Sequence, residues 1–336
     1  MSTVFIRTVD LERAGKDPMK DKAGREIDYM RISITDRCNL RCKYCMPGDI
    51  ETTDMANLLT YEEITKVTET VASLGIRHIR LTGGEPLVRR GCVDLVKKIK
   101  NISGIDTVGM TTNGVLLAEH ARALKEAGLD SVNVSLDTLD ETEFQRLTGR
   151  DELKAVLAGI GAAQEVEIPV KINTVHYKNL DWRAVLAYAD ERQIPVRFIE
   201  MMPIGYGAAY IGKSNEELFR QIEDCYGSAA EARKYGAGPA VYYHFPGLNI
   251  DVGFISAIHH KFCKNCNRIR LTSEGYLKLC LCYEKGVDLR AVLRDPEKGQ
   301  ALQEVMKKAI LEKPVEHCFE QISEMTEHKA MVRIGG

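Results

Sequence analysis

The chain has 336 residues, 44% of them hydrophobic and 28% charged, which is the balance of a globular protein with one large domain or two smaller ones. Its formal net charge of -2 argues against nucleic-acid binding through bulk electrostatics, so any anionic ligand must be held by a local group of cations. No apolar run approaches the roughly 20 residues of a membrane span, and the first residues lack the apolar stretch of a signal peptide. We therefore expect a cytoplasmic protein with no nucleic-acid and no membrane partner.

Strand-like and helix-like stretches alternate six times through the first two thirds of the chain. The strand-like runs are Met30–Thr35, His78–Thr82, Thr107–Thr111, Ser131–Ser135, Val170–Val175 and Val196–Glu200. The helix-like runs are Thr60–Leu74, Gly91–Asn101, Ala118–Ala127, Glu152–Glu165, Leu180–Arg192 and Ser214–Tyr226. Such alternation implies parallel strands joined by right-handed helical crossovers, in a doubly wound sheet or an open barrel. The barrel is favoured because unusual residues gather just after the strands, where barrels place their chemistry.

The alternation breaks after Gly227, where a segment rich in Gly and Pro leads into cysteine-bearing short strands. We therefore predict an α/β fold in three parts. They are an N-terminal arm over residues 1–24, a partial (β/α)6 barrel over residues 25–226, and a smaller C-terminal domain over residues 227–336 that holds a second metal cluster.

Six of the ten cysteines fall into two groups of three. Cys38, Cys42 and Cys45 have the spacing C-x3-C-x2-C, and three thiolates can hold a 4Fe-4S cluster whose fourth iron stays open to an outside ligand. A zinc site would need four closed ligands, and no nearby Cys or His supplies the fourth.

The second group has the spacing C-x2-C-x13-C, with Cys263, Cys266 and Cys280. Zinc remains an even alternative here, because Cys282 or a nearby His could complete four ligands. We expect Cys282 to be a packed thiol. We expect the remaining cysteines to be buried as small apolar residues. These are Cys92, Cys225 and Cys318.

Arg268 and Arg270 follow the second group on a predicted strand, so both side chains point to one face. Guanidinium groups suit a phosphate, a carboxylate or a purine edge. A solvated strand face is the alternative interpretation.

The first cysteine group, in the loop after the first strand, resembles the signature of the radical S-adenosylmethionine superfamily. Gly83-Gly84-Glu85-Pro86 after the second strand resembles the element of that superfamily that meets the methionine part of the cofactor. The resemblance implies that S-adenosylmethionine binds at the open iron. It also implies a set of cofactor contacts: Tyr44, Gly84, Glu85, Ser135 and Met202.

The segment from Phe262 to Thr272, together with Cys280 and the double glycine at 335 and 336, resembles the GTP 3′,8-cyclase family, whose members begin molybdenum cofactor biosynthesis. The resemblance implies a second 4Fe-4S cluster with an open iron, against which the guanine of GTP binds. The implied substrate contacts are Arg31, Arg80, Thr111, Lys171, Arg197, Arg268, Ile269 and Arg270. The implied catalytic residues are Arg31, Arg268, Arg270, Gly335 and Gly336.

The same resemblance implies that a radical from the cofactor removes hydrogen from C3′ of GTP, which then closes onto C8. The product would be (8S)-3′,8-cyclo-7,8-dihydroguanosine 5′-triphosphate. Implied partners are a one-electron reductant of the ferredoxin or flavodoxin type, the downstream cyclic pyranopterin monophosphate synthase and a second copy in a homodimer. Alternatives are a peptide-modifying radical enzyme with an auxiliary cluster, and an electron carrier or zinc adaptor, which would leave the Gly-Gly-Glu-Pro element unexplained.

Overall fold

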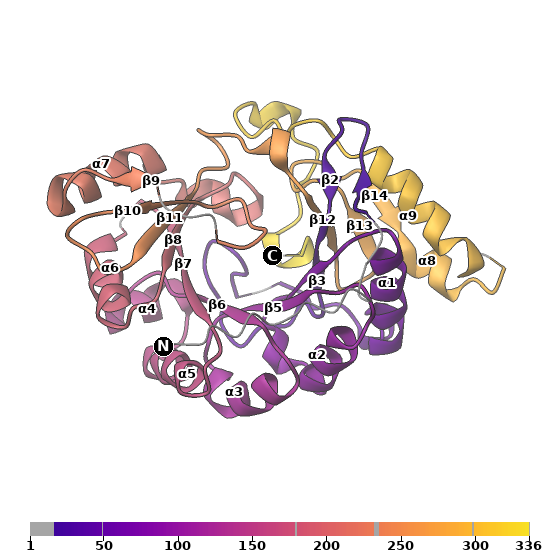
Figure 1. Ribbon diagram of the computed structural model, residues 1–336, viewed down its shortest axis with the longest axis horizontal. Coiled ribbons are helices and arrows are strands. Elements are labelled where there is room, and N and C mark those ends of the chain that lie inside the picture. Colours follow the sequence, from indigo (N-terminus) through magenta and orange to yellow (C-terminus); the bar gives the residue numbers. More distant parts are fainter. Residues whose placement is uncertain (1–16, 49, 179, 232–234, 298, 336) are drawn as a thin grey trace, which may run out of the picture.

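A curved sheet of twelve strands forms the centre of the computed structural model, which describes residues 17–48, 50–178, 180–231, 235–297 and 299–335. Six neighbouring strands in the middle of the sheet are parallel, and each corresponds to a predicted strand. They are β3 (Tyr29–Ser33), β4 (His78–Thr82), β5 (Thr107–Thr112), β6 (Ser131–Ser135), β7 (Val170–His176) and β8 (Val196–Glu200). Figure 1 shows them as an arc. Among the described strands β14 and β9 stay at the two edges, so the sheet is an open arc, as a partial barrel requires.

Helices cover the outer side of the arc (Figure 1). They are α1 (Tyr61–Ser73), α2 (Cys92–Lys100), α3 (Leu117–Glu126), α4 (Glu141–Thr148), α5 (Leu153–Glu165), α6 (Trp182–Glu191) and α7 (Asn215–Tyr226). The main core lies between these helices and the sheet, where Ile64 and Val67 of α1 join Ile32 and Leu81 of the strands. Side chains alternate across a strand, so the neighbours of these core residues face the inside of the arc.

The C-terminal part of the chain extends this sheet at both edges. On one side β11 (Asp251–Ile255) pairs in parallel with β8, followed outward by β10 (Val241–His244) and β9 (Ala230–Glu231). On the other side β12 (Arg268–Leu271) pairs in parallel with β3, followed by β13 (Tyr276–Lys278) and β14 (Gly286–Asp288). The predicted boundary at residue 227 therefore falls within one continuous sheet, and a separate C-terminal domain stays a prediction.

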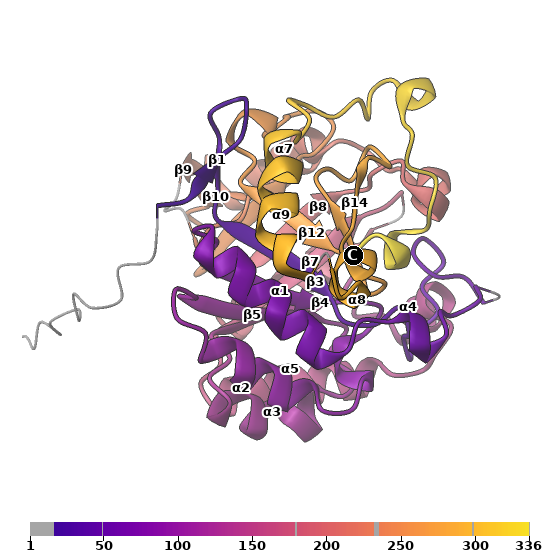
Figure 2. The ribbon, with the colours of Figure 1, turned by 90° about the vertical axis from the view of Figure 1, so that its right-hand side faces the viewer.

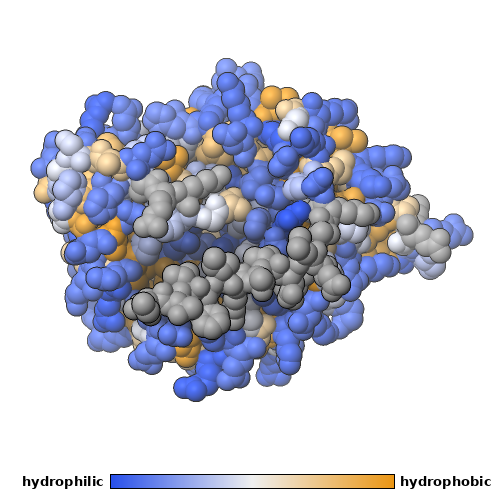
Figure 3. Space-filling view, in the orientation of Figure 1, coloured by the Kyte–Doolittle hydropathy of each residue, from blue (hydrophilic) through white to orange (hydrophobic). Residues whose placement is uncertain are grey.

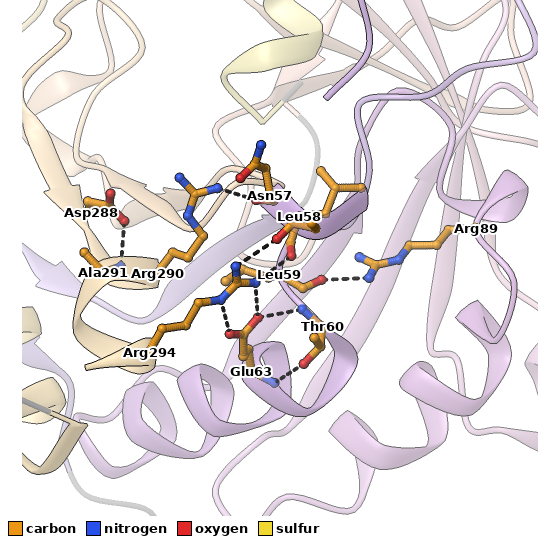
Figure 4. A network of polar contacts seen from close by, with 11 residues as sticks. Asn57, Leu58, Leu59, Thr60, Glu63, Arg89, Asp288, Arg290, Ala291 and Arg294 are labelled. Carbon is orange, nitrogen blue, oxygen red and sulfur yellow. Dashed lines mark hydrogen bonds and ion pairs between the residues drawn. The ribbon is translucent and has the colours of Figure 1, made fainter. Parts of the chain in front are cut away.

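Two C-terminal helices, α8 (Leu289–Arg294) and α9 (Leu302–Leu311), pack beside the start of the barrel, with α9 next to α1 (Figure 2). Figure 4 shows how α8 is tied to the N-terminus of α1. Thr60 and Glu63 form the predicted capping box, and Arg294 lies 2.7 Å from the Glu63 carboxylate. Arg290 donates to the backbone carbonyl of Asn57 at 2.6 Å. These contacts fix the chain between the first cysteine loop and α1.

Residues 1–16 of the predicted N-terminal arm lie outside the described residues. The following residues include β1 (Met19–Lys20), which pairs with β2 (Glu26–Ile27) in a hairpin. Figure 3 shows that hydrophilic residues dominate the face seen in Figure 1, with scattered hydrophobic ones. In the described part of the chain, none of the helices has the length and apolar character needed to cross a membrane.

Candidate active site

Both groups of three cysteines line a single cavity of about 340 Å³. Its lining includes Cys38, Cys42 and Cys45 from the loop after β3, and Cys263, Cys266 and Cys280 from the C-terminal part. The parallel strands bring the first group there, because the loop follows the carboxyl end of β3. The pairing of β12 with β3 brings the second group to the same place.

The two glycines of Gly83-Gly84-Glu85-Pro86 allow that segment to lie directly against the first cysteine loop. A Cβ atom would stand 2.5 Å from the Thr35 carbonyl oxygen at Gly83, and 2.4 Å from the Arg37 carbonyl oxygen at Gly84. The backbone N–H of Gly84 donates to Thr35 at 2.7 Å, and that of Glu85 donates to Arg37 at 2.8 Å. Any side chain at these glycines would push the cysteine loop away.

Glu85 is fully buried behind the cavity rather than in its lining. Its carboxylate accepts hydrogen bonds from the Thr112 hydroxyl at 2.8 Å and from the Asn113 backbone N–H at 2.6 Å. Burial raises the pKa of Glu85 to about 7. Asn113 lines the cavity, and its Nδ2 lies 2.7 Å from Asn39 Oδ1 and 3.6 Å from Cys38 Sγ. Asn113 was not among the predicted site residues, although its position after β5 was a usable signal.

Tyr44 lines the cavity and donates its hydroxyl to the carboxylate of Asp137, a second residue that the sequence analysis did not single out. The other Asp137 oxygen accepts from the Val175 backbone N–H at 2.8 Å. Burial raises the pKa of Asp137 to about 6. Tyr44 is thus held in a fixed orientation between the second and third cysteines of its group.

The thiols of the first group are half-buried in the cavity wall. Burial raises the pKa of Cys38, and it raises the pKa of Cys45 to about 12. Burial, followed by the charges of Cys45 and Asp137, raises the pKa of Cys42 well above its usual value. Across the described ranges, no three His, Cys, Asp or Glu side chains are placed to hold a single metal ion. Three cysteines on one cavity wall form a donor set of the kind that holds an iron–sulfur cluster.

Cations surround the second group. Lys313 is buried, lines the cavity and donates to the carbonyls of Arg268 at 2.9 Å and Leu279 at 2.5 Å. Burial opposes ionisation of Cys266, but the charges of Lys313 and Arg268 outweigh it and lower the Cys266 pKa to about 7. Arg25 donates to the Cys263 carbonyl at 2.9 Å. Neither Arg25 nor Lys313 was a predicted site residue.

The strand register arranges the predicted substrate residues in rows across the inside of the arc. Arg270, Arg31 and Arg80 are direct neighbours on β12, β3 and β4. In a second row, Thr111 of β5 and Lys171 of β7 lie on either side of Asn133 of β6. In a third row, Ser135 of β6 and Arg197 of β8 lie on either side of Asn173 of β7. For both Arg31 and Lys171, burial and the positive charges of Arg80 and Arg197 lower the pKa, so these cations repel one another across the inside of the arc.

Several polar atoms of this group are buried without a hydrogen-bond partner among the described residues, including Arg31 Nε, Arg197 Nε and Thr111 Oγ1. Burial, followed by the charges of Arg197 and Arg80, lowers the pKa of Lys171 to about 8. Arg80 is already engaged by Tyr29 Oη at 2.8 Å and the Met110 carbonyl at 2.9 Å. Orphaned donors and repelling cations fit a bound polyanion, since buried donors without partners are costly.

Eight of the predicted non-cysteine site residues line the cavity: Arg31, Tyr44, Gly84, Thr111, Ser135, Met202, Arg268 and Arg270. Others lie behind or beside it: Arg80, Glu85, Lys171, Arg197, Ile269 and Gly335. Ile269 is buried in the main core, on the opposite side of β12 from the two arginines. Gly336 lies outside the described residues. The ligand roles of these residues stay predictions.

Cysteines outside the two groups have varied surroundings. Cys282 is buried, with its sulfur 3.1 Å from that of Cys318 and outside the cavity lining, as expected for a packed thiol. Cys92 is also buried. The prediction of a buried Cys225 was wrong, because this residue is exposed in the last turn of α7, beyond the last buried position Ile222.

Comparison with known proteins identifies the family. Residues 32–191 match the radical SAM superfamily, and residues 194–319 match a family described as Molybdenum Cofactor Synthesis C. The GTP 3′,8-cyclase of Clostridium perfringens (strain 13 / Type A) is 43% identical over 323 residues, covering 95% of this chain and 100% of that protein. The GTP 3′,8-cyclase of Petrotoga mobilis is 42% identical over 328 residues, with the same coverage of each chain. The chain belongs to the GTP 3′,8-cyclase family of the radical SAM superfamily.

Solved structures show the same architecture outside the cyclase family. Streptococcus suis SuiB bound to S-adenosylmethionine matches with a TM-score of 0.61 at 14% identity, covering 91% of this chain and 77% of that chain. SuiB bound to the precursor peptide SuiA matches with a TM-score of 0.63. At this identity the likeness extends to the fold alone. As a member of the radical SAM superfamily, the protein uses S-adenosylmethionine and an iron–sulfur cluster.

Proposed function

We propose that this protein converts GTP into (8S)-3′,8-cyclo-7,8-dihydroguanosine 5′-triphosphate, the first step of molybdenum cofactor biosynthesis. One observation carries the proposal: two groups of three cysteines open onto the same cavity as Arg31, Arg268 and Arg270, and the buried Arg31 Nε has no hydrogen-bond partner among the described residues. The relatives named GTP 3′,8-cyclase, which align over nearly the whole chain, supply the identity of the anion.

The first cysteine group would hold the 4Fe-4S cluster that, when bound, supplies the electron for reductive cleavage of S-adenosylmethionine. Around it, the protein's own residues orient and shield the cofactor. Backbone groups beside Gly84 and the polar side chain of Ser135 can meet its methionine part. Tyr44, fixed by Asp137, and Met202 offer an aromatic and an apolar surface for the adenine.

The second group, Cys263, Cys266 and Cys280, would hold a second 4Fe-4S cluster, which when bound offers an open iron to the guanine and an electron for the final reduction. Arg268 and Arg270 point into the same cavity, as does Arg31 from the adjacent strand. Their fixed positive charges can orient the purine and favour its reduction.

The triphosphate would be held by Arg80, Lys171 and Arg197, with the Thr111 hydroxyl as a neutral donor. Each charge-assisted hydrogen bond of this kind contributes about 1.5–3 kcal/mol. Since the net charge of the chain is only -2, the attraction for GTP arises from this local group. Gly335 and Gly336 complete the proposed catalytic set, because residues without side chains can enter a crowded cavity.

The chemistry also defines partners. Two reductive events require an external one-electron donor of the ferredoxin or flavodoxin type. The cyclised nucleotide must pass to the cyclic pyranopterin monophosphate synthase. We further propose that the protein is cytoplasmic and that a homodimer is its assembly.

A peptide-modifying role has less support. The SuiB structure with its precursor peptide shares only 14% identity with this chain, whereas the relatives above 40% are named cyclases. The arginines that line the cavity, Arg31, Arg268 and Arg270, also suit a purine nucleotide, whose ring edge and negative charge guanidinium groups can bind.

The proposal is tested by incubating reduced, anaerobic protein with S-adenosylmethionine and GTP deuterated at C3′. We expect a cyclised nucleotide and deuterium in the released 5′-deoxyadenosine. Cofactor cleavage without a cyclised nucleotide, or label transfer only from another ribose position, would overturn the proposed reaction.

A further inference from the structure

Residues 331–335, here called the tail segment, contact both cysteine regions of the cavity. Met331 lines the cavity at the start of a short 3-10 turn, Met331–Arg333. The backbone N–H of Val332 donates to the Cys45 thiol of the first group. Ile334 is buried in a separate apolar cluster with Cys282 and Phe319, next to the second group. Figure 1 shows these yellow residues inside the arc.

Arg333 binds the tail segment to the first cysteine loop. Its Nη1 lies 3.0 Å from Asp36 Oδ2, and its guanidinium also donates to the Thr53 hydroxyl and the Glu51 carbonyl. Asp36 is 1% exposed and stands two residues before Cys38. A carboxylate this deeply buried is costly without a cation. The Thr53 backbone N–H also donates to Asp36 Oδ2 at 2.6 Å, and Arg333 supplies the cation that compensates the charge of Asp36.

The other end of the tail segment meets the second region. Gly335 has φ +90°, a conformation that residues with a Cβ rarely adopt, and its carbonyl accepts from Arg270 Nη1 at 3.3 Å. Arg270 also lines the cavity. The three-residue span from Arg333 to Gly335 thus joins the loop of one cysteine group to the cations of the other.

We propose that Arg333 is a positioning residue for the cyclisation: its ion pair with Asp36 sets where the tail segment enters the cavity relative to the first cysteine loop. Displacement of the tail segment would leave cofactor cleavage possible but would uncouple it from product formation. The catalytic part of this inference rests on the proposed function, whereas the anchoring part does not.

Hydrogen exchange of the full-length protein with its clusters, measured anaerobically by mass spectrometry, tests the anchoring by Arg333 without any substrate. In Arg333→Gln we expect the amides of residues 332–335 to exchange about ten- to a hundredfold faster, the effect of losing one hydrogen bond to a charged group. Thr53→Val removes an acceptor of Arg333 and should produce a smaller increase. The matched control is Lys329→Gln, an exposed cation just before the tail segment. Unchanged exchange in Arg333→Gln, or an equal change in the control, would overturn the anchoring.

The coupling ratio of the loaded enzyme tests the catalytic consequence. In Arg333→Gln we expect 5′-deoxyadenosine to form while cyclised nucleotide per cleavage falls at least about tenfold. Arg333→Lys, which keeps the charge facing Asp36, should recover part of the ratio. Faster exchange with an unchanged ratio would restrict Arg333 to stability and overturn the positioning role. If the unmodified protein itself makes no cyclised nucleotide, the proposed function fails. The hydrogen-exchange result still shows whether Arg333 anchors the tail segment.

Discussion

The two cysteine groups open onto one cavity but differ in construction. The first is a single loop, packed against Gly83-Gly84 and held by backbone hydrogen bonds from neighbouring strand ends. The second is assembled from two segments, and the buried side chains of Arg25 and Lys313 hold it in place. Their electrostatics differ too. Burial raises the pKa of all three thiols in the first group, whereas in the second group it raises that of Cys263 but is outweighed at Cys266, where the charges of Lys313 and Arg268 lower the pKa to about 7.

This difference assigns separate tasks to the two ends of the cavity. Positive charges near cysteine sulfurs favour the reduced state of a cluster, so cation-rich surroundings raise its reduction potential. The first group, with Cys42 beside the Asp137 carboxylate, suits a strong reductant. The second group, beside Lys313 and Arg268, suits an acceptor or donor at higher potential, next to the place proposed for GTP.

Removing one cysteine from each group should separate the two tasks most strongly. In Cys42→Ala we expect the first cluster and all 5′-deoxyadenosine formation to be lost, because the remaining thiolates cannot hold the cube. In Cys266→Ala we expect loss of the second cluster and of cyclised nucleotide, with cofactor cleavage retained. Iron analysis, Mössbauer spectra and product assays measure each quantity.

The exposed Cys225 provides the control, since Cys225→Ala should keep both clusters and full turnover. Zinc in place of iron at the second group, or loss of cofactor cleavage in Cys266→Ala, would contradict the division of tasks between the groups.

The sequence predicted most of the framework because local pattern and tertiary structure agree there. All six barrel strands and the capping box at Thr60 follow from periodicity and capping chemistry. The helix α4 was missed, because Glu141–Thr148 buries only Phe144 and Leu147 as large apolar residues. Its signal was present in Asp140, whose side chain caps the backbone N–H of Glu143 at 2.6 Å.

The supports of the site were harder to predict than its cysteines. Cys38 and Cys263 can be recognised by the spacing of the cysteines around them, whereas nothing in the sequence distinguishes Arg25 and Lys313 from other cations. Their roles depend on contacts between residues far apart in the sequence. Arg25 and Cys263, for example, are 238 positions apart. The pairing of β12 with β3, which creates these contacts, carries no short-range signal.

The GTP end of the cavity should respond to charge removal without disturbing the other end. In Lys171→Ala we expect GTP binding to weaken about tenfold to a hundredfold, through loss of one charge-assisted interaction. Binding of S-adenosylmethionine should barely change. Isothermal titration of each ligand measures both effects, with the exposed Lys154 changed to Ala as the control. Equal losses for both ligands would mean that Lys171 supports the fold instead.

The contrast in charge should appear in the potential of the second cluster. In Lys313→Met we expect that potential to fall by about 59 mV, which is a tenfold change in a one-electron equilibrium. The melting temperature should also fall, since the carbonyls of Arg268 and Leu279 lose a donor. Spectroelectrochemical titration measures the potential, and Lys308→Met, at an exposed position of α9 just before Lys313, is the control. If the reduction potential of the first cluster fell instead, or if the control lowered the potential of the second cluster equally, the proposed difference in charge between the two groups would be wrong.

The smallest expected effect is a pH dependence of GTP binding. Burial and the charges of Arg197 and Arg80 lower the pKa of Lys171 to about 8 in the free protein. A bound triphosphate favours the protonated amine, so the pKa of Lys171 rises on binding, and affinity is fully present below pH 8 and lost as the pH rises through it. From the fraction protonated, we expect binding about twofold weaker at pH 8 than at pH 7, and about tenfold weaker at pH 9. Lys171→Arg keeps its charge over this range and should give a nearly flat profile. A profile for Lys171→Arg as steep as that of the unmodified protein would assign the titration to another group, such as the guanine itself.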